Sequence, residues 1–483
     1  MANPVAPIII RGDVIDTDLI EYPGRGDVMT FDAPDPRKFV DRLPLSSPAQ
    51  LTDLYDLSLE DILDYLEELG SCLDINKNEH MQRSRDLTYD ATPLPREIID
   101  MGYQGFSSFF NREQVRQIAE KSVGIDYLEG WVPHTLNDGV IMKVRAFGSR
   151  TLHIVAGNGP GLGLITLARC AITRSDCIIK APSNDPFTSA ALALTMVDMA
   201  PDHPITNHFS VAYWKGGDAE VEDKLYQPHN IEKIVAWGGL AGIRHVTKYI
   251  QPGLELISLD PKTSISVVGP GALENEETMR ETAGRLAVDI GGANQAGCAS
   301  SRVTYVVAGD RDDAAERVTE LGQMTYDAIM ALPPNFSTKP KAYDKELKSH
   351  VDALRWDDEW FEVIGGEDDE GAIIISKLPR QVDFAAYLAD RTANLVTCES
   401  IDDVLLGINA YSQTIGVWPE SYKSELENIV PLYGAQRLVT LGNALYNGPL
   451  LGMAHDGIQP VSRMVKWISN EIFEGVTDSS PLS

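Results

Sequence analysis

The segment GGANQAGCASSRVTYVV, from Gly291 to Val307, carries the strongest structural signal in the chain. Its first part places Cys298 among small residues, and its second part, Val303–Val307, has the β-branched and aromatic composition of a strand. Small residues let a carbonyl carbon approach the sulfur closely, and an adjoining strand holds the sulfur in place. This is the setting of a nucleophilic thiol. A lone cysteine is more often an inert buried side chain, so the interpretation of Cys298 as a nucleophile depends on residues elsewhere in the chain.

Around this segment, from about residue 150 onward, short apolar strands alternate with helices, as in open α/β sheets. Strands are expected at 152–156, 176–180, 209–214, 234–237 and 265–268, and helices at 162–171, 186–199, 277–289 and 312–332. The pattern predicts an α/β protein with two open twisted sheets, an N-terminal hairpin and a small tail extension. We expect domains at 1–257, 258–450 and 451–483, with a final amphipathic helix at 461–472.

Composition excludes several classes of function. The 483 residues are 43% hydrophobic and 23% charged, and the formal net charge is −30. A surface this acidic repels nucleic acid and anionic membranes, so neither is expected as a partner. The first residues lack the features of a signal peptide and no stretch is long enough to span a membrane, which favours the cytoplasm. Any phosphate site must be locally basic or built from backbone N–H groups.

The cysteine pattern indicates neither a disulfide framework nor a metal site. The five cysteines are an odd number, are widely spaced and contain no CxxC pair. Two Arg-Gly-Asp triplets, at Arg11–Asp13 and Arg25–Asp27, are interpreted as turns rather than adhesion motifs, since an apolar strand precedes the first.

Two glycine-rich loops each follow a strand and precede a helix. In the first, 157–163, no register places glycine at all three positions of a dinucleotide fingerprint. Asn158 in this loop either points its amide at a developing oxyanion or caps its own turn. In the second, Gly238 and Gly239 allow close approach of a pyrophosphate to a helix N-terminus, or form a plain turn. Between the loops, Lys180 and Ser183 hold a ribose or its phosphate, or are solvated.

The order of these elements resembles the aldehyde dehydrogenase superfamily over most of the chain, and within it the LuxC family of fatty acyl-CoA reductases. The narrower resemblance is carried by the Cys298 segment, by YWKGGD at 213–218 and by HDGIQPV at 455–461. It implies an aldehyde dehydrogenase-like fold, Cys298 as nucleophile and the Asn158 amide as part of an oxyanion hole. It also implies that Lys180 and Ser183 contact the adenosine ribose, and that Gly238 and Gly239 belong to the cofactor loop.

Two departures from the superfamily pattern bear on the chemistry. Ser258 stands where hydrolytic members have a water-activating glutamate, although Glu255 lies three residues away and would take that place in another register. Asn184 stands where many NAD-dependent members have an acidic residue, so a 2′-phosphate would not be repelled. The resemblance therefore implies NADPH as cofactor, with NADH possible.

The implied activity is NADPH-dependent reduction of a fatty acyl-CoA to the aldehyde through an acyl-cysteine intermediate, with no metal. Two other activities stay open: oxidation of aldehydes to acids, with Glu255 as base, and reduction of acyl groups delivered by a carrier or an acyl-protein synthetase. The alternative from a different class of function is a scaffold protein that has the same fold and no catalytic activity. His455, in the closing segment, is either an acid or acyl-donor contact or a packing or loop residue, and the second interpretation is favoured. The superfamily implies a homo-oligomer.

Overall fold

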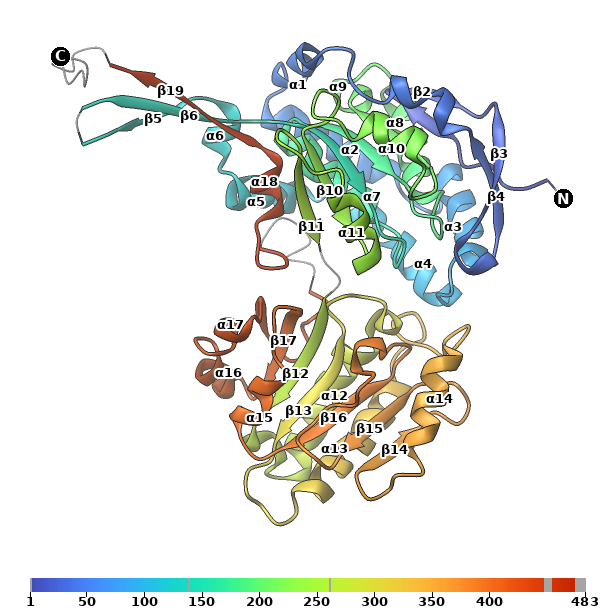
Figure 1. Cartoon of the computed structure of the whole chain (residues 1–483), viewed down its shortest axis with the longest axis vertical. Helices are drawn as coiled ribbons and strands as arrows, with labels where there is room; N and C mark the ends of the chain where they lie inside the picture. The colour runs from blue at the N-terminus through green and yellow to red at the C-terminus, as the bar shows by residue number, and fades with distance from the viewer. Residues whose placement is uncertain (1, 138, 260–261, 447–453, 474–483) are drawn as a thin grey trace.

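The first sheet has seven strands in the order β11-β10-β7-β8-β9-β1-β2 in the computed structural model, which describes residues 2–137, 139–259, 262–446 and 454–473 (Figure 1). Five parallel strands form most of it: β7 (Arg150–Ile154), β8 (Asp176–Lys180), β9 (Phe209–Ala212), β10 (Lys233–Trp237) and β11 (Glu255–Leu259). The predicted hairpin, β1 (Ile8–Ile10) with β2 (Asp13–Ile15), is confirmed and adds an antiparallel edge. Helices cover both faces, which explains why these strands are continuous apolar runs.

The helices on the two faces of this sheet come from different parts of the chain. One face packs against α7 (Leu162–Thr173), α8 (Thr188–Met199), α2 (Leu59–Cys72) and α5 (Arg112–Ser122), with α3 (Glu79–Ala91) and α4 (Arg96–Gln104) outside them. The other face packs against α10 (Ala219–Leu225) and α11 (Leu240–Thr247). A capping box of Ser58 and Asp61 begins α2, and the helix ends at Cys72.

The second sheet also has seven strands, in the order β14-β15-β16-β13-β12-β17-β18. Its strands are β12 (Thr263–Val268), β13 (Ser301–Val307), β14 (Phe361–Gly365), β15 (Ala372–Ser376), β16 (Ala393–Cys398), β17 (Ser412–Trp418) and β18 (Arg437–Thr440). One face carries α12 (Glu276–Gly291) and α13 (Ala314–Met330), and the other carries α14 (Lys345–Leu354), α15 (Ile401–Leu406) and α16 (Glu420–Leu426). The suggested domain boundary at residues 450 and 451 lies outside the described residues.

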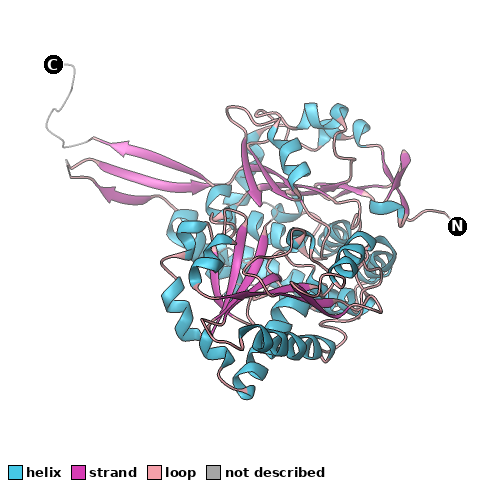
Figure 2. Ribbon diagram, turned by 60° about the horizontal axis from the view of Figure 1, so that its bottom comes forward, coloured by secondary structure: helices cyan, strands magenta, loops and turns pink. Residues whose placement is uncertain are grey.

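A three-stranded arm projects from the body beside the first sheet (Figures 1 and 2). It consists of β5 (Val132–Thr135), β6 (Ile141–Phe147) and β19 (Lys466–Ile472) in the order β19-β6-β5. The predicted helix at 461–472 is therefore wrong for most of its length, because only α18 (Pro460–Met464) is helical. All seven residues of β19 pair with β6, and this long-range pairing leaves no trace in the local sequence pattern.

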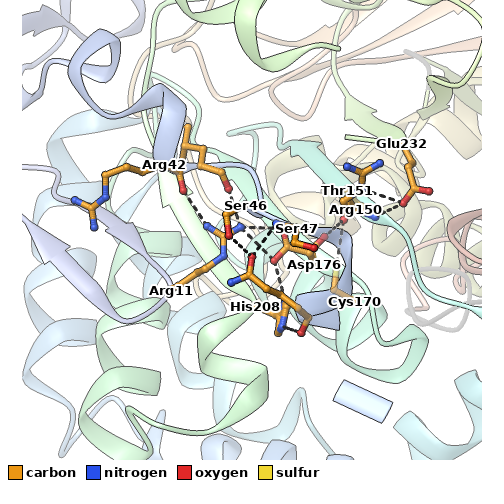
Figure 3. A network of polar contacts seen from close by, with 12 residues as sticks. Arg11, Arg42, Ser46, Ser47, Arg150, Thr151, Cys170, Asp176, His208 and Glu232 are labelled. Atoms are coloured by element: carbon orange, nitrogen blue, oxygen red, sulfur yellow. Dashed lines mark hydrogen bonds and ion pairs between the residues drawn. The ribbon is translucent and has the colours of Figure 1, made fainter. Parts of the chain in front are cut away.

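A buried polar network joins the N-terminal hairpin to the first sheet (Figure 3). Arg11, in the turn of the hairpin, lies 3.1 Å from Oδ2 of Asp176 at the start of β8. Nδ1 of His208 lies 2.9 Å from the other carboxylate oxygen, and its Nε2 lies 2.9 Å from Asp53. Because Asp176 is 2% exposed, its charge depends on these two cationic partners.

No helix in the described ranges combines the length and the apolar character that crossing a membrane requires.

Candidate active site

Cys298 lies in the loop between α12 and β13, which is a central strand of the second sheet. The two sheets lie one above the other in Figure 1. The chain reaches it through three successive residues in the left-handed region, Ala293, Asn294 and Gln295, with φ of 50°, 52° and 61°. Such a backbone persists only where surrounding contacts fix it. The backbone of the Cys298 loop is therefore held by contacts with its surroundings and is not a relaxed turn.

Hydrogen bonds from the side chains of this loop supply those contacts. The buried amide of Gln295 donates to the carbonyls of Ser301, at 2.8 Å, and Thr392, at 3.0 Å, and accepts from the Thr392 N–H at 3.1 Å. Asn294 makes a two-way pair with the backbone of Thr338. The Ser264 hydroxyl donates to the Cys298 carbonyl at 2.8 Å. The sulfur is thus held relative to three neighbouring strands of the sheet.

A cavity of about 620 Å³ lies between the two sheets and reaches Cys298. All the site residues that the sequence indicated line it: Cys298, Asn158, Lys180, Ser183, Gly238 and Gly239. They come from both α/β units and span some 140 positions, so the fold, rather than sequence proximity, brings them together.

A second cavity of about 110 Å³ opens on Cys298 and contains neither Asn158 nor the glycine loops. Its walls are largely apolar or small: Gly297, Ala299, Thr414, Ala444, Leu445 and Ala454 are among them. Cys298, His455 and Asp456 line both cavities. The thiol therefore stands at the boundary between two spaces of different character.

Electrostatics favour the thiolate of Cys298. Burial would raise its pKa, but the hydrogen bond and charge of His455 and the amide of Gln413, 3.5 Å from the sulfur, outweigh burial and lower it. Burial lowers the pKa of His455, yet Asp456, with Oδ1 3.2 Å from Nδ1, and Cys298 raise it to about 9. A thiolate–imidazolium pair is the arrangement that activates cysteine nucleophiles.

Asn158 faces this pair from the first glycine-rich loop. Its Nδ2 donates to the carbonyl of Ala296 at 3.0 Å, two residues before Cys298. The side chain is exposed to the cavity. An amide so placed has a second N–H available for an oxygen bound at the sulfur.

The residues at the other part of the cavity fit a dinucleotide. Lys180 is partly buried at the end of β8, and burial lowers its pKa to about 8; its ammonium lies 5.5 Å from the centre of the Trp214 ring. Gly238 and Gly239 precede α11, and no atom lies within 4 Å of where a Cβ on either would stand. A cationic side chain and an open helix N-terminus form a donor set that suits phosphates.

Asn184 holds the first glycine-rich loop in place. Its Nδ2 donates to the carbonyl of Gly157 at 2.6 Å, and the side chain is 8% exposed. A Cβ on Gly157 would lie 2.0 Å from the Asn184 amide oxygen, which explains the glycine. Asn184 lines the cavity without charge while it clamps the loop that carries Asn158.

Glu255 as the water-activating base is wrong. It begins β11, whose other end, Leu259, lines the cavity, and four residues of strand separate the two by roughly 13 Å. Its carboxylate pairs with Lys233 at 2.9 Å and Arg463 at 2.6 Å. Ser258 lies next to Leu259, and Asp260 and Pro261 lie outside the described residues.

The sequence left the role of His455 open, with packing favoured over an acid or an acyl-donor contact, and it did not identify Asp456 and Gln413 as parts of the site. His455 and Asp456 belong to the closing segment that carried the family resemblance. Gln413, the second residue of β17, donates to Asp456 at 2.6 Å and to the Cys298 sulfur at 3.5 Å, so it bridges the thiol and the carboxylate beside His455. More than a hundred residues separate Cys298 from each of them, and no local signal marks such a contact.

Cys170 and Cys177 lie elsewhere, in a buried cluster with His153 beneath the first sheet. Nε2 of His153 lies 3.2 Å from the Cys170 sulfur, and Thr151 lies 3.7 Å from it (Figure 3). Neither thiol lines the cavity at Cys298.

The model of the acyl-CoA reductase (LuxC) family matches residues 54–467 of the chain. The chain belongs to this family. As a member of the LuxC family it is an enzyme, an oxidoreductase that reduces acyl groups. It is similar to a long-chain acyl-protein thioester reductase of Photorhabdus luminescens, 27% identical over 456 residues that cover 89% of this chain and 87% of the relative. A reductase of the same name from Vibrio harveyi is 26% identical over 478 residues, which cover 96% of this chain and 93% of the relative.

Solved structures show which fold this LuxC-family chain has. It superposes on an NADP-dependent glyceraldehyde-3-phosphate dehydrogenase from Bacillus halodurans C-125, complexed with NADP, with a TM-score of 0.69 and 12% identity over 98% of this chain and 99% of the other. For lactaldehyde dehydrogenase from Escherichia coli the TM-score is 0.69 and the sequence identity is 12%, and the superposition covers 97% of this chain and 99% of the other. The predicted aldehyde dehydrogenase-like fold is confirmed.

Proposed function

We propose that the protein reduces acyl-CoA thioesters to aldehydes with NADPH, through an acyl group carried on Cys298. The observation that carries this proposal is the place of Cys298 at the boundary of two cavities, one fitted to a dinucleotide and one largely apolar. A nucleophile between a hydride donor and an acyl group is what thioester reduction requires.

The residues of the chain divide the work as follows. The Cys298 thiolate attacks the thioester carbonyl carbon, and Asn158 Nδ2 with the Cys298 backbone N–H stabilises the oxyanion. The bond between carbon and the CoA sulfur breaks, and the His455 imidazolium, held by Asp456, is placed to give a proton to the leaving thiolate. An acyl-Cys298 thioester and free CoA result.

Lys180, Ser183 and the Gly238–Gly239 loop would hold the dinucleotide in the larger cavity. Bound NADPH would supply the hydride that reduces the acyl carbon. Addition of hydride to the carbon of the acyl-Cys298 thioester would leave an oxyanion at the position that Asn158 Nδ2 faces. Collapse of this oxyanion breaks the bond between carbon and the Cys298 sulfur, which releases the aldehyde and restores the thiolate without any proton transfer.

The position of Glu255 supports transfer and reduction over hydrolysis. Its carboxylate pairs with Lys233 and Arg463 at the distant end of β11 and cannot activate water at Cys298. Asp456, the carboxylate that does lie beside Cys298, is engaged by Gln413 and His455. With Glu255 distant and Asp456 so engaged, the acyl-enzyme persists long enough to be reduced.

A second acyl donor has specific support. The relatives from Photorhabdus luminescens and Vibrio harveyi are named acyl-protein thioester reductases. We therefore propose acyl groups on a carrier or synthetase protein as the alternative donor. Transfer to Cys298 from acyl-CoA but not from an acylated protein, or the reverse, would decide between the two.

We further propose that the arm joins copies of the chain. Trp467 and Ile468 on β19 are 44% and 40% exposed, and β19 and β5 are unpaired edges within the described residues. Exposed edges with apolar side chains are where other chains pair. A cytoplasmic location is proposed as well, because a free thiol nucleophile needs a reducing compartment.

Intact mass spectrometry after mixing with hexanoyl-CoA, without NADPH, tests the acyl-enzyme directly. We expect the mass of one hexanoyl group on Cys298, lost on addition of hydroxylamine and absent in Cys298→Ala. The same adduct on Cys298→Ala, or hydrolysis of the thioester to free acid at the rate of acylation, would overturn the proposal.

A further inference from the structure

Arg25 lines the large cavity although it comes from the far N-terminal part of the chain. It lies in the short turn between β3 (Leu19–Pro23) and β4 (Thr30–Pro34). Its neighbour Gly24 lies against the cofactor domain, because a Cβ on Gly24 would stand 3.5 Å from the carbonyl oxygen of Ser183. The tip of this hairpin therefore reaches the residues that the sequence placed at the adenosine ribose.

An aromatic cluster fixes the hairpin in this position. Tyr22 on β3 and Phe31 on β4 pack edge-to-face on Tyr213, with ring centres 4.8 and 4.9 Å apart. Phe31 also packs on Phe187, at 6.0 Å, three residues after Asn184. All four rings are at least nine-tenths buried. Contacts of this kind hold a β-ribbon rigidly, so the turn carrying Arg25 keeps its place over the cavity.

Three donors on this part of the cavity have no hydrogen-bonding partner in the described structure. They are the guanidinium of Arg25, the hydroxyl of Ser183 and the ammonium of Lys180, which lies over the Trp214 ring and feels the charge of the buried Glu222. Asn184, the remaining polar group beside them, is uncharged and bonded to Gly157. Glu222 does not line the cavity, so this part of the wall carries two cations and no lining carboxylate, which favours an anion even in a chain of net charge −30.

We propose that Arg25, with Ser183 and Lys180, forms a binding site for a phosphate monoester on the adenosine ribose, the 2′-phosphate that distinguishes NADPH from NADH. This inference rests on the proposed function for the placing of the ribose beside Lys180 and Ser183. The pyrophosphate has its own place at Gly238 and Gly239, where α11 begins. An arginine suits the remaining phosphate because its planar fork binds two oxygens at once.

Binding of four nucleotides, with no acyl substrate present, tests this site. Dissociation constants are measured by titration calorimetry for NADPH, NADH, 2′,5′-ADP and 5′-AMP. We expect Arg25→Gln to weaken NADPH and 2′,5′-ADP by about 10- to 100-fold, the loss typical of charge-assisted hydrogen bonds. NADH and 5′-AMP should change less than about twofold.

Arg244→Gln is the matched control. It removes the same charge from an exposed residue of α11 that does not line the cavity, and all four constants should stay unchanged. Arg25→Lys should recover only part of the loss, because lysine restores the charge without the fork.

Equal weakening of NADH and NADPH in Arg25→Gln would overturn the inference, as would wild-type protein that binds 2′,5′-ADP no better than 5′-AMP. These results are independent of catalysis. Acyl transfer to Cys298 can still succeed when the Arg25 site fails, and selective binding of 2′,5′-ADP can still be found when acyl transfer fails.

Discussion

At the scale of single residues, the proposed chemistry depends on a pair of groups that the sequence keeps far apart. Cys298 and His455 meet because the chain returns from the second sheet to the boundary of both cavities. The lowered pKa of the thiol has one dominant favourable cause, the imidazolium of His455. Removing this residue leaves the opposing effect of burial unbalanced.

His455→Gln should therefore raise the pKa of Cys298 from below its ordinary value of 9.0 to above it. The rate of iodoacetamide alkylation at Cys298, followed against pH by peptide mass spectrometry, measures this. The midpoint of the wild-type profile should lie below 9.0 and that of the variant above it. His80→Gln, in an outer ion pair with Asp198, is the control and should keep the wild-type profile. Identical midpoints in His455→Gln and wild type would contradict the thiolate–imidazolium pair.

Asn158→Ala should slow formation of the acyl-enzyme by on the order of 10²–10³, the usual cost of one oxyanion donor. Single-turnover release of CoA measures the step, and the dissociation constant of NADPH should stay the same. Asn76→Ala, on an exposed turn, should have no effect on either quantity. A loss confined to NADPH affinity would mean that Asn158 belongs to the cofactor site alone.

At the scale of elements, the loop between α12 and β13 is held by side chains rather than by regular structure. Gln295→Leu removes an amide that pairs three buried backbone groups. Each unpaired group costs about 1–3 kcal/mol, so urea unfolding should show a loss of at least that size. Acyl-enzyme formation should fall as well. Gln323→Leu, at an exposed contact with Asp327 on α13, should leave both unchanged. Full acylation by Gln295→Leu would show that the left-handed residues need no such support.

The junction of hairpin and sheet should respond to pH through His208. Burial lowers the pKa of His208, but Asp176 and Asp53 outweigh burial and raise it. A raised pKa means that the stabilisation is fully present below the unfolded value of 6.5 and is lost as the pH rises through the folded pKa. His208→Gln should therefore destabilise the protein by about 1–3 kcal/mol at pH 6 and by less at pH 9. A deficit in urea unfolding that is equal at both values would contradict this linkage.

The secondary-structure elements also show how much of the fold could be predicted from the sequence. The strand–loop–helix units around Asn158 and Gly238 and the helix–loop–strand unit around Cys298 were predictable, because each combines a continuous apolar run with glycines in the loop. Strand β19 was not, since its partner β6 lies over three hundred residues away. Glu255 stayed open as an alternative to Ser258 because a register error of three residues exchanges the two, and only the structure shows that Glu255 begins β11 at the end far from the cavity.

At the scale of the whole molecule, the two sheets share one cavity, and the arm extends beyond both (Figure 2). Residues from the β3–β4 hairpin, both α/β units and the returning C-terminal segment line that cavity. Such convergence follows from tertiary structure, which is why no local pattern marked Arg25 as a residue of this cavity.

Trp467→Glu should convert an oligomer into smaller species if the arm joins copies of the chain. A charge on an exposed edge strand opposes pairing with another chain. Light scattering after size exclusion measures the mass, and the apolar-to-acidic change Trp356→Glu, at a 91% exposed position on the second domain, is the control. An unchanged mass in Trp467→Glu, or a monomeric wild type, would exclude the arm as the interface.

The central claim is reduction of a thioester on Cys298, and oxidation of NADPH in the presence of acyl-CoA tests it most directly. Short, long and aromatic acyl chains are compared, the aldehyde is trapped and quantified, and Cys298→Ala is the control. We predict one aldehyde for each NADPH consumed with at least one class of acyl chain, and neither product in Cys298→Ala. Wild-type protein that consumes no NADPH with any thioester, but oxidises aldehydes to free acids with NAD⁺ or NADP⁺, would contradict the claim.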